Sequence, residues 1–191
     1  MEISPADFFQ PLNFSEIFGR DAPLEIDLGS GEGAFLATTA QRHPERNFLG
    51  IEKLLGRVRK TCRRVEKLGL ENVRVLRLDS TFAVRVLIPR ESVAAFHILF
   101  ADPWPKRRHW PRRLIQPDFL DAISGALAPG GEVRMKTDDA PYFQHMRDVL
   151  KTRSDLCETA WPDHPHEPRT DFETHFVALG LPIHRVRLVK T

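Results

Sequence analysis

The sequence has few of the features that mark secreted or membrane proteins. It holds only two cysteines, Cys62 and Cys157, and their wide separation predicts neither a disulfide framework nor a zinc site. No run of about 18 apolar residues occurs, so no membrane span is expected. The first residues, Met-Glu-Ile-Ser-Pro, lack the basic start and apolar stretch of a secretory signal. We therefore expect a cytoplasmic protein that binds neither membrane nor metal.

The sequence also lacks a strong excess of charge of either sign. Its 28 Lys and Arg residues face 26 Asp and Glu residues, for a formal net charge of +2, which does not by itself indicate a nucleic-acid partner. The cations are gathered in two short segments, however, and such local clusters can contact phosphates. One cluster contains Lys106, Arg107, Arg108, Arg112 and Arg113, and the other contains Arg57, Arg59, Lys60, Arg63, Arg64 and Lys67.

The spacing of apolar residues predicts strands and helices that alternate along the chain. Strands are predicted at 24–28, 47–51, 73–78, 95–100, 132–136 and 183–189, and helices at 34–42, 54–68, 114–127, 141–151 and 171–179. This alternation is typical of a doubly wound α/β sheet. Residues 1–22 are interpreted as an N-terminal arm. No repeat or linker divides the chain, so a single domain over 1–191 is expected.

Acidic residues follow four of the predicted strands. In doubly wound sheets the ligand lies beyond the carboxyl ends of the strands. We therefore expect one crevice to gather the four side chains of Glu52, Asp79, Asp102 and Asp138.

A glycine loop, Gly29-Ser-Gly31-Glu-Gly33, separates the first main strand from its helix. Glycine lets the backbone approach a ligand closely, and the pattern with Glu52 about 20 residues on also fits a dinucleotide fingerprint. The loop alone therefore leaves a nicotinamide cofactor and S-adenosylmethionine both open. Asp27 and Glu32 would oppose a pyrophosphate at this position and would suit a ligand that carries an ammonium and a sulfonium.

The segment from Asp102 to Arg113 combines a carboxylate, two tryptophans and several cations. Pro103 and Pro105 stiffen the loop because each fixes its own φ. Basic groups bind phosphates, and aromatic rings can stack on unpaired bases. The segment therefore favours an RNA substrate, although Trp104 is equally compatible with packing in the core.

At these motifs the sequence resembles the bacterial tRNA (guanine-N7)-methyltransferase family. The family's acid and glycine loop match Asp27 to Gly33, its Gly-Ile-Glu matches residues 50–52, and its Asp-Pro-Trp-x-Lys-x-Arg-His matches residues 102–109. Its Arg-Arg, Thr-Asp and late Thr-x-Phe-Glu motifs match residues 112–113, 137–138 and 170–173. Ala101 and Pro111 depart from the family pattern, and the N-terminal arm is shorter than in many members.

The resemblance implies a Rossmann-like methyltransferase fold, with a mostly parallel seven-stranded sheet whose last strand is antiparallel. It implies S-adenosyl-L-methionine as cofactor, tRNA as partner, a guanine of the tRNA variable loop as target, and a monomer or homodimer. The cofactor-binding residues it implies are Asp27, Gly29, Gly31, Gly33, Glu52, Asp79 and Asp102. The implied substrate-binding residues are Lys106, Asp138, Thr170, Asp171, Phe172 and Glu173, beside a substrate-side loop at 161–170, and the implied tRNA phosphate contacts are Arg107, Arg108, Arg112 and Arg113.

Asp102 is the expected catalytic residue. Guanine N7 carries a lone pair and no proton, so its methylation needs placement in line with the methyl–sulfur bond and no general base. The product base is cationic, and a nearby carboxylate stabilises the developing charge. The base must leave its stack to reach such a pocket.

Several of these features also have purely structural interpretations. The basic residues of helix 54–68 lie opposite an apolar face and are compatible with a solvated surface; that face contains Leu54, Val58, Cys62, Val65 and Leu68. Phe172 and Phe176 have the spacing of core residues on a helix. Thr170 and Glu173 fit a capping box. His164 and His166 make a poor metal site.

Three other functions remain open from the sequence. A small-molecule methyltransferase would share the cofactor but would not need the basic loop. A nicotinamide-dependent dehydrogenase fits the glycine fingerprint but is opposed by Asp27 and Glu32. A non-catalytic RNA-binding domain could keep the fold, but the acid at Asp102 argues against it.

Overall fold

The computed structural model describes residues 1–162 and 167–191, so the predicted His164 and His166 of the loop lie outside the described residues. In the described part, eight strands form one sheet in the order β1-β4-β3-β2-β5-β6-β8-β7. They are β1 Glu2–Ile3, β2 Leu24–Leu28, β3 Asn47–Ile51, β4 Val73–Leu76, β5 Val93–Leu99, β6 Leu127–Thr137, β7 Leu156–Thr159 and β8 His184–Lys190.

The pairing of the strands confirms the predicted class of fold. Strands β1 to β6 pair in parallel, and β8 lies antiparallel to both β6 and β7. The sheet has one strand more than the seven expected, and two of its strands, β1 and β7, were not among the strands predicted from residue spacing. From β2 the chain adds β3 and β4 on one side of the sheet and then β5 and β6 on the other. The boundary between β2 and β5 is therefore the switch point, where doubly wound sheets bind ligands.

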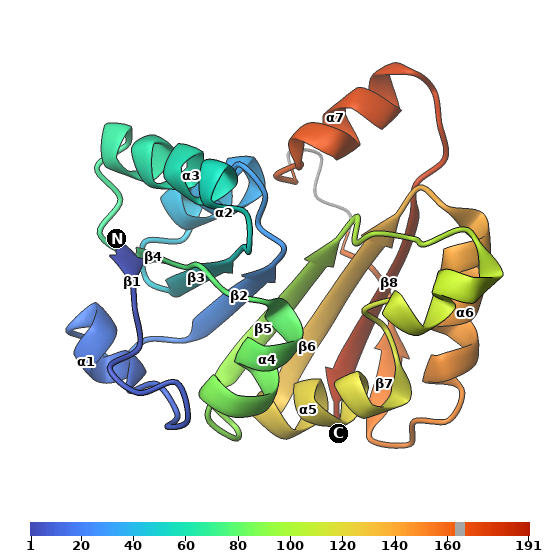
Figure 1. The fold of residues 1–191 in the computed structure, drawn as a ribbon, viewed down its shortest axis with the longest axis horizontal. Helices are drawn as coiled ribbons and strands as arrows, with labels where there is room; N and C mark the ends of the chain where they lie inside the picture. The colour runs from blue at the N-terminus through green and yellow to red at the C-terminus, as the bar shows by residue number, and fades with distance from the viewer. Residues whose placement is uncertain (163–166) are drawn as a thin grey trace.

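Helices cover the sheet, and the longer ones lie close to their predicted positions. Figure 1 shows α2 and α3 near one end of the sheet, α6 near the other, and α7 beyond the upper ends of β5 and β6. The α-helices are α1 Phe14–Phe18, α2 Ala34–Arg42, α3 Leu55–Lys67, α4 Ser80–Phe82, α5 Pro117–Ala126, α6 Ala140–Leu150 and α7 Asp171–Ala178. A π-helical turn follows α4 at Ala83–Leu87, and a 3-10 helix spans Arg107–Arg112.

The apolar face predicted for α3 is correct at its centre and wrong at its ends. Val58 and Val65 are fully buried, whereas Leu54 and Leu68 are 48% and 42% exposed. Thr61 takes the remaining buried position, because its small side chain faces the glycine loop and donates to the carbonyl of Gly31 at 3.1 Å.

The N-terminal arm packs onto the sheet. Strand β1 extends the parallel sheet beside β4, and Leu12 and Phe18 are buried in the main hydrophobic core. Asn13 caps α1 by accepting a hydrogen bond from the backbone N–H of Glu16. None of the helices in the described part is long and apolar enough to cross a membrane.

A buried, hydrogen-bonded carboxylate, Glu25, lies next to α2, because its partner His97 packs against the Phe35 ring of that helix. The imidazole Nε2 of His97 on β5 is 2.7 Å from Oε2 of Glu25 on β2, and Arg46 donates to Oε1 of the same carboxylate at 2.5 Å. Hydrogen bonds and charges from these two partners outweigh the effect of burial and lower the pKa of Glu25 to about 2. These contacts provide hydrogen-bond partners for the buried Glu25 carboxylate and the buried His97 ring.

Candidate active site

A cavity of about 570 Å³ opens at the switch point between β2 and β5. This volume is within the usual range for small-molecule sites. The predicted residues that line it include Gly29, Glu52, Asp79, Asp102, Arg112 and Arg113. The predicted site residues that are not among the described residues lining the cavity are Asp27, Gly31, Gly33, Lys106, Arg107, Arg108, Asp138 and the 170–173 motif. Three of the four strand-end carboxylates therefore meet as predicted, and Asp138 does not.

Glu52 is fixed against the glycine loop. It is 4% exposed, and its Oε2 accepts from the backbone N–H of Gly31 at 3.2 Å while its Oε1 accepts from that of Leu54 at 2.8 Å. The carboxylate thus closes the loop onto the end of β3. This rigid arrangement presents a negative charge beside Gly29, where ribose hydroxyls can donate to it.

Gly33 is required at the start of α2 for two reasons. Its φ of 75° is in the left-handed region, and a Cβ built on it would lie 2.5 Å from Cγ2 of Thr61. The absence of a side chain therefore allows α2 and α3 to approach each other at the loop.

Asp27 is buried below the glycine loop and is 4% exposed. Burial, with a smaller contribution from the nearby Glu52 charge, raises the pKa of Asp27 to about 7. Glu32 has a different environment, because it extends to the surface and binds Nζ of Lys60 at 2.5 Å. Of the two acids expected to oppose a pyrophosphate, Glu32 is therefore paired with a lysine, whereas Asp27 is not paired in this way among the described residues.

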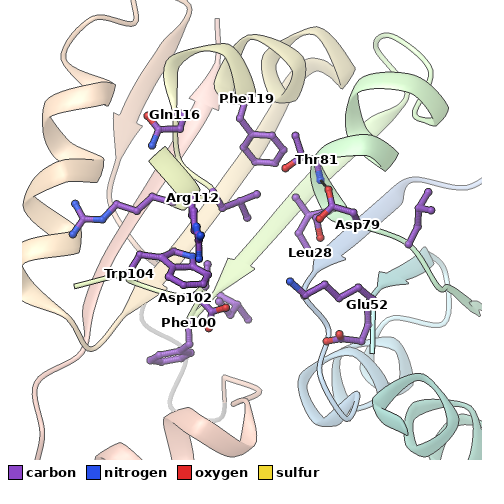
Figure 2. A pocket seen from close by; sticks show the side chains of 18 of the residues that line it. Leu28, Glu52, Asp79, Thr81, Phe100, Asp102, Trp104, Arg112, Gln116 and Phe119 are labelled. Carbon is purple, nitrogen blue, oxygen red and sulfur yellow. Dashed lines mark hydrogen bonds between the residues drawn. The ribbon is translucent and has the colours of Figure 1, made fainter. Parts of the chain in front are cut away.

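Asp79 begins the short helix after β4. Its Oδ1 accepts from the backbone N–H groups of Thr81 and Phe82 at 3.0 and 3.2 Å, which is a standard N-cap. The cap orients the side chain, which lines the cavity opposite Asp102. Figure 2 shows Asp79 and Glu52 across the cavity from Asp102.

Asp102 lies between two aromatic residues whose backbones are strained. Phe100 has a φ of 58° and Trp104 a φ of 44°, values that bulky residues rarely adopt, and both line the cavity. Figure 2 shows Asp102 between the rings of Phe100 and Trp104. The exposed carboxylate is therefore flanked by two apolar surfaces of the size of a nucleobase. Trp104 is half-buried at the cavity wall.

The basic segment forms a 3-10 helix next to the cavity. Lys106, Arg107, Arg108 and Arg112 are exposed, as a phosphate-binding surface requires. Arg113 differs, because it is 3% exposed, donates from Nε to the carbonyl of Pro103 at 2.8 Å, and has the rings of Trp110 and Tyr142 within about 5 Å of its guanidinium. In this structure Arg113 braces the Asp102 loop.

The late Thr-x-Phe-Glu motif begins α7. Thr170 accepts from the backbone N–H of Glu173 at 2.9 Å, so half of the predicted capping box is confirmed. The Glu173 side chain does not complete it, because it binds Lys136 instead. Phe172 is 52% exposed, so the prediction that it packs in the core is wrong, whereas Phe176 contacts the ring of Phe100 at a centroid distance of 5.7 Å.

Sequence reasoning missed two residues near this site. Phe100 reads as the last apolar residue of a strand, and its strained backbone has no sequence signal. Lys136 reads as a solvated residue of an alternating strand, yet its side chain is 2% exposed. Its place directly before Thr137-Asp138 was the one available signal.

The fold is similar to that of solved proteins. A solved structure of an S-adenosylmethionine-dependent methyltransferase from Aquifex aeolicus matches it with a TM-score of 0.62 at 14% identity, over 93% of this chain and 88% of that one. The architecture is therefore the Rossmann-like fold of S-adenosylmethionine-dependent methyltransferases.

Sequence comparisons identify the family within this class. The family model described as "Putative methyltransferase" matches residues 21–186. The tRNA (guanine-N(7)-)-methyltransferase of Alkalilimnicola ehrlichii is 42% identical over 90% of this chain and 74% of the relative. That of Nitrosomonas europaea is 36% identical over 95% and 83%. The chain belongs to the tRNA (guanine-N(7)-)-methyltransferase family.

Proposed function

We propose that this protein transfers the methyl group of S-adenosylmethionine to N7 of a guanine in the variable loop of tRNA. The observation that carries the proposal is one cavity that has Gly29, Glu52 and Asp79 on one side and Asp102 with Arg112, an exposed cation of the 3-10 helix, on the other. Family membership supplies the substrate class, because the relatives are named for this reaction.

The chemistry of the residues at the switch point fits the cofactor. Asp27 is a buried acid whose pKa is raised by burial and by the nearby Glu52 charge, and the amino acid end of S-adenosylmethionine carries an ammonium that can pair with it. Gly29 leaves space for the cofactor to approach the backbone closely. Glu52 can accept hydrogen bonds from the ribose hydroxyls, and Asp79 can accept one from the adenine amine. When bound, the cofactor supplies a methyl group on a positively charged sulfur.

The substrate side is formed by the basic segment and by α7. Lys106, Arg107, Arg108 and Arg112 form an exposed cationic surface beside the cavity, suited to tRNA phosphates. We assign the target base to the space near Asp102, with Asp138 and the stretch from Thr170 through Asp171 and Phe172 to Glu173 in contact with the substrate. The exposed ring of Phe172 is available to stack on an unpaired base.

Asp102 stabilises the charge that develops on the base. Guanine N7 attacks without losing a proton, so the enzyme has to hold the base in line and tolerate a positive product. The Asp102 carboxylate lies at the end of β5 between two aromatic rings, where a flat base can be held. Its negative charge then opposes the positive charge that forms in the transition state.

The decisive experiment is incubation with unmodified tRNA and methyl-labelled cofactor, followed by mapping of the labelled nucleoside. Label in 7-methylguanosine of the variable loop is the expected result. Label at another nucleoside would refute the assignment of N7 but preserve the assignment as an RNA methyltransferase. Label only in a metabolite extract would refute the RNA substrate.

The role of Asp102 is tested with Asp102→Asn, which keeps the shape and removes the charge. We expect kcat to fall by about 100-fold, the scale of one lost electrostatic contact in a transition state. Cofactor affinity, measured by calorimetry, serves as the control for cofactor binding. Methyl transfer by Asp102→Ala within a few-fold of the wild type would rule out the role.

A further inference from the structure

Lys136 is an ammonium group held inside the protein at the end of β6. Its side chain is 2% exposed, and it is the last residue but one of the strand. A buried ammonium is strongly unfavourable unless it is paired and hydrogen-bonded. Its surroundings therefore have to supply acidic hydrogen-bond partners. Lys136 also lies near the substrate side of the cavity, so we asked whether these partners serve the substrate.

Three side chains surround the ammonium. Nζ donates to Oε1 of Glu173 at 2.8 Å and lies 3.2 Å from Oε2 of Glu167. The ring of Trp161 lies with its centroid 5.0 Å from Nζ, and its Nε1 donates to Glu167 at 3.2 Å. Lys136 thus connects β6 to helix α7 and to both described ends of the 161–170 loop.

The cluster leaves one carboxylate oxygen without a partner. Two carboxylates, those of Glu167 and Glu173, face the one ammonium. In the part of the chain that the structure describes, Oε2 of Glu173 is buried and accepts no hydrogen bond. Such an atom is costly to leave unpaired, so it indicates a donor supplied from outside the chain.

Helix α7 also touches the wall of the cavity. Phe176, three residues after Glu173, packs against Phe100, and Phe100 lines the cavity next to Asp102. The backbone N–H of Phe100 donates to the carbonyl of Lys136 at 2.8 Å. Glu173 therefore lies close to the Asp102 side of the cavity, on a helix that Lys136 and Phe100 hold in place.

We infer that Lys136 is a positioning residue that orients Glu173 toward the substrate base. By binding Oε1, it leaves Oε2 to accept from the N1–H and N2–H donors of the guanine edge. Adenine presents an acceptor at N1 where guanine presents a donor, so it cannot make the same pair of hydrogen bonds. This inference rests on the proposed function, and it assigns to Lys136 an effect on tRNA use and none on the cofactor.

The first test compares Lys136→Met with Lys136→Arg, and uses Lys190→Met as a matched control. Lys190 is also partly buried and donates to a carbonyl, that of Leu127, but it stands at the opposite end of β8 from the residues that face Lys136. We expect Lys136→Met to lower kcat/KM for tRNA by about 10- to 100-fold, the cost of a misplaced contact. The Kd of the cofactor should stay unchanged, the charge-preserving Lys136→Arg should recover most of the loss, and Lys190→Met should match the wild type.

The second test is a double-mutant cycle of Lys136→Met with Glu173→Gln. If Lys136 acts through Glu173, the double variant loses no more kcat/KM than Glu173→Gln alone. Additive losses, a wild-type kcat/KM for Lys136→Met, or a loss that appears equally in cofactor affinity would overturn the inference.

The same cycle measured by urea unfolding separates this inference from the proposed function. It reports the contact between Lys136 and Glu173 without any substrate, and we expect the two destabilising effects to be non-additive. If the wild-type protein places no label on guanine N7, the proposed function fails and so does the base contact, but a positive unfolding cycle still establishes the link between β6 and α7. Additive unfolding effects would refute the link even in an active enzyme.

Discussion

The clearest consequence of the site concerns the stability of Asp27→Asn. Because the pKa of Asp27 is raised from 3.8 to about 7, the folded protein binds a proton there that the unfolded chain releases between these values. Stability is therefore lost as pH rises from 3.8 through 7. About three pH units at 1.36 kcal/mol each give a total cost of about 4 kcal/mol above pH 7.

The assay is urea unfolding of both proteins between pH 5 and pH 8. Over this range the wild type should lose about 2.5 kcal/mol that Asp27→Asn keeps, because the amide does not ionise. Any fixed cost of burying the amide is the same at both pH values and cancels from this difference. Asp7→Asn, at an exposed position on the N-terminal arm, is the matched control and should follow the wild type.

The same residue should make cofactor binding depend on pH. A carboxylate that pairs with the cofactor ammonium has to lose its proton, so the wild-type Kd should improve by roughly 50-fold between pH 5 and pH 7. Asp27→Asn should bind weakly at both pH values. Parallel unfolding curves for variant and wild type would refute the titration of Asp27, and a wild-type Kd that is flat with pH would refute its role as the cation ligand.

Two further predictions follow from the packing around the site. Gly33→Ala should lower the free energy of unfolding by about 2 kcal/mol, because φ is positive at this position and the new Cβ would contact Cγ2 of Thr61. In urea unfolding, adding Thr61→Ser to this variant should recover part of the loss, because serine lacks Cγ2. The pKa of Glu25 is lowered from 4.5 to about 2, so its ionisation contributes about 3 kcal/mol of stability above pH 4.5, and this stability is lost as pH falls through 2. Glu25→Gln should therefore lower the free energy of unfolding at pH 7. The variant's free energy of unfolding should also decline less in acid than that of the wild type.

The sequence predicted most accurately the elements whose signals are local. Strand β2, the glycine loop and α2 were placed to the residue, because an apolar run, three glycines and a helical pattern follow one another within 20 residues. The 3-10 helix of the basic segment was missed because it has no apolar period and contains Pro111. The segment after Asp79 was missed for a similar reason, since a three-residue helix passes directly into a π-helical turn.

The site was predictable where chemistry follows a strand end, and less so where it depends on contacts between distant segments. Glu52, Asp79 and Asp102 meet because parallel strands end at one edge of the sheet. The burial of Lys136 and Arg113 depends on α7 and on the Asp102 loop, which fold over them from far along the chain. No spacing rule distinguishes a buried cation of this kind from a solvated one, because its burial depends on a segment that is distant in the sequence.

Glu25 and Asp27 show how the same strand can use two buried acids in opposite ways. They are two residues apart on β2, so their side chains point to the same face of the sheet, and both are nearly inaccessible to water. Glu25 has His97 and Arg46 as hydrogen-bond partners, and its pKa is about 2. Burial and the nearby Glu52 charge raise the pKa of Asp27 to about 7. The fold supplies hydrogen-bond partners to Glu25 on this face, whereas the ion pairs of the described residues do not include Asp27. This contrast supports the proposal that Asp27 binds a cationic ligand. If Asp27 binds the cofactor ammonium, as proposed, cofactor binding should recover the stability lost at Asp27.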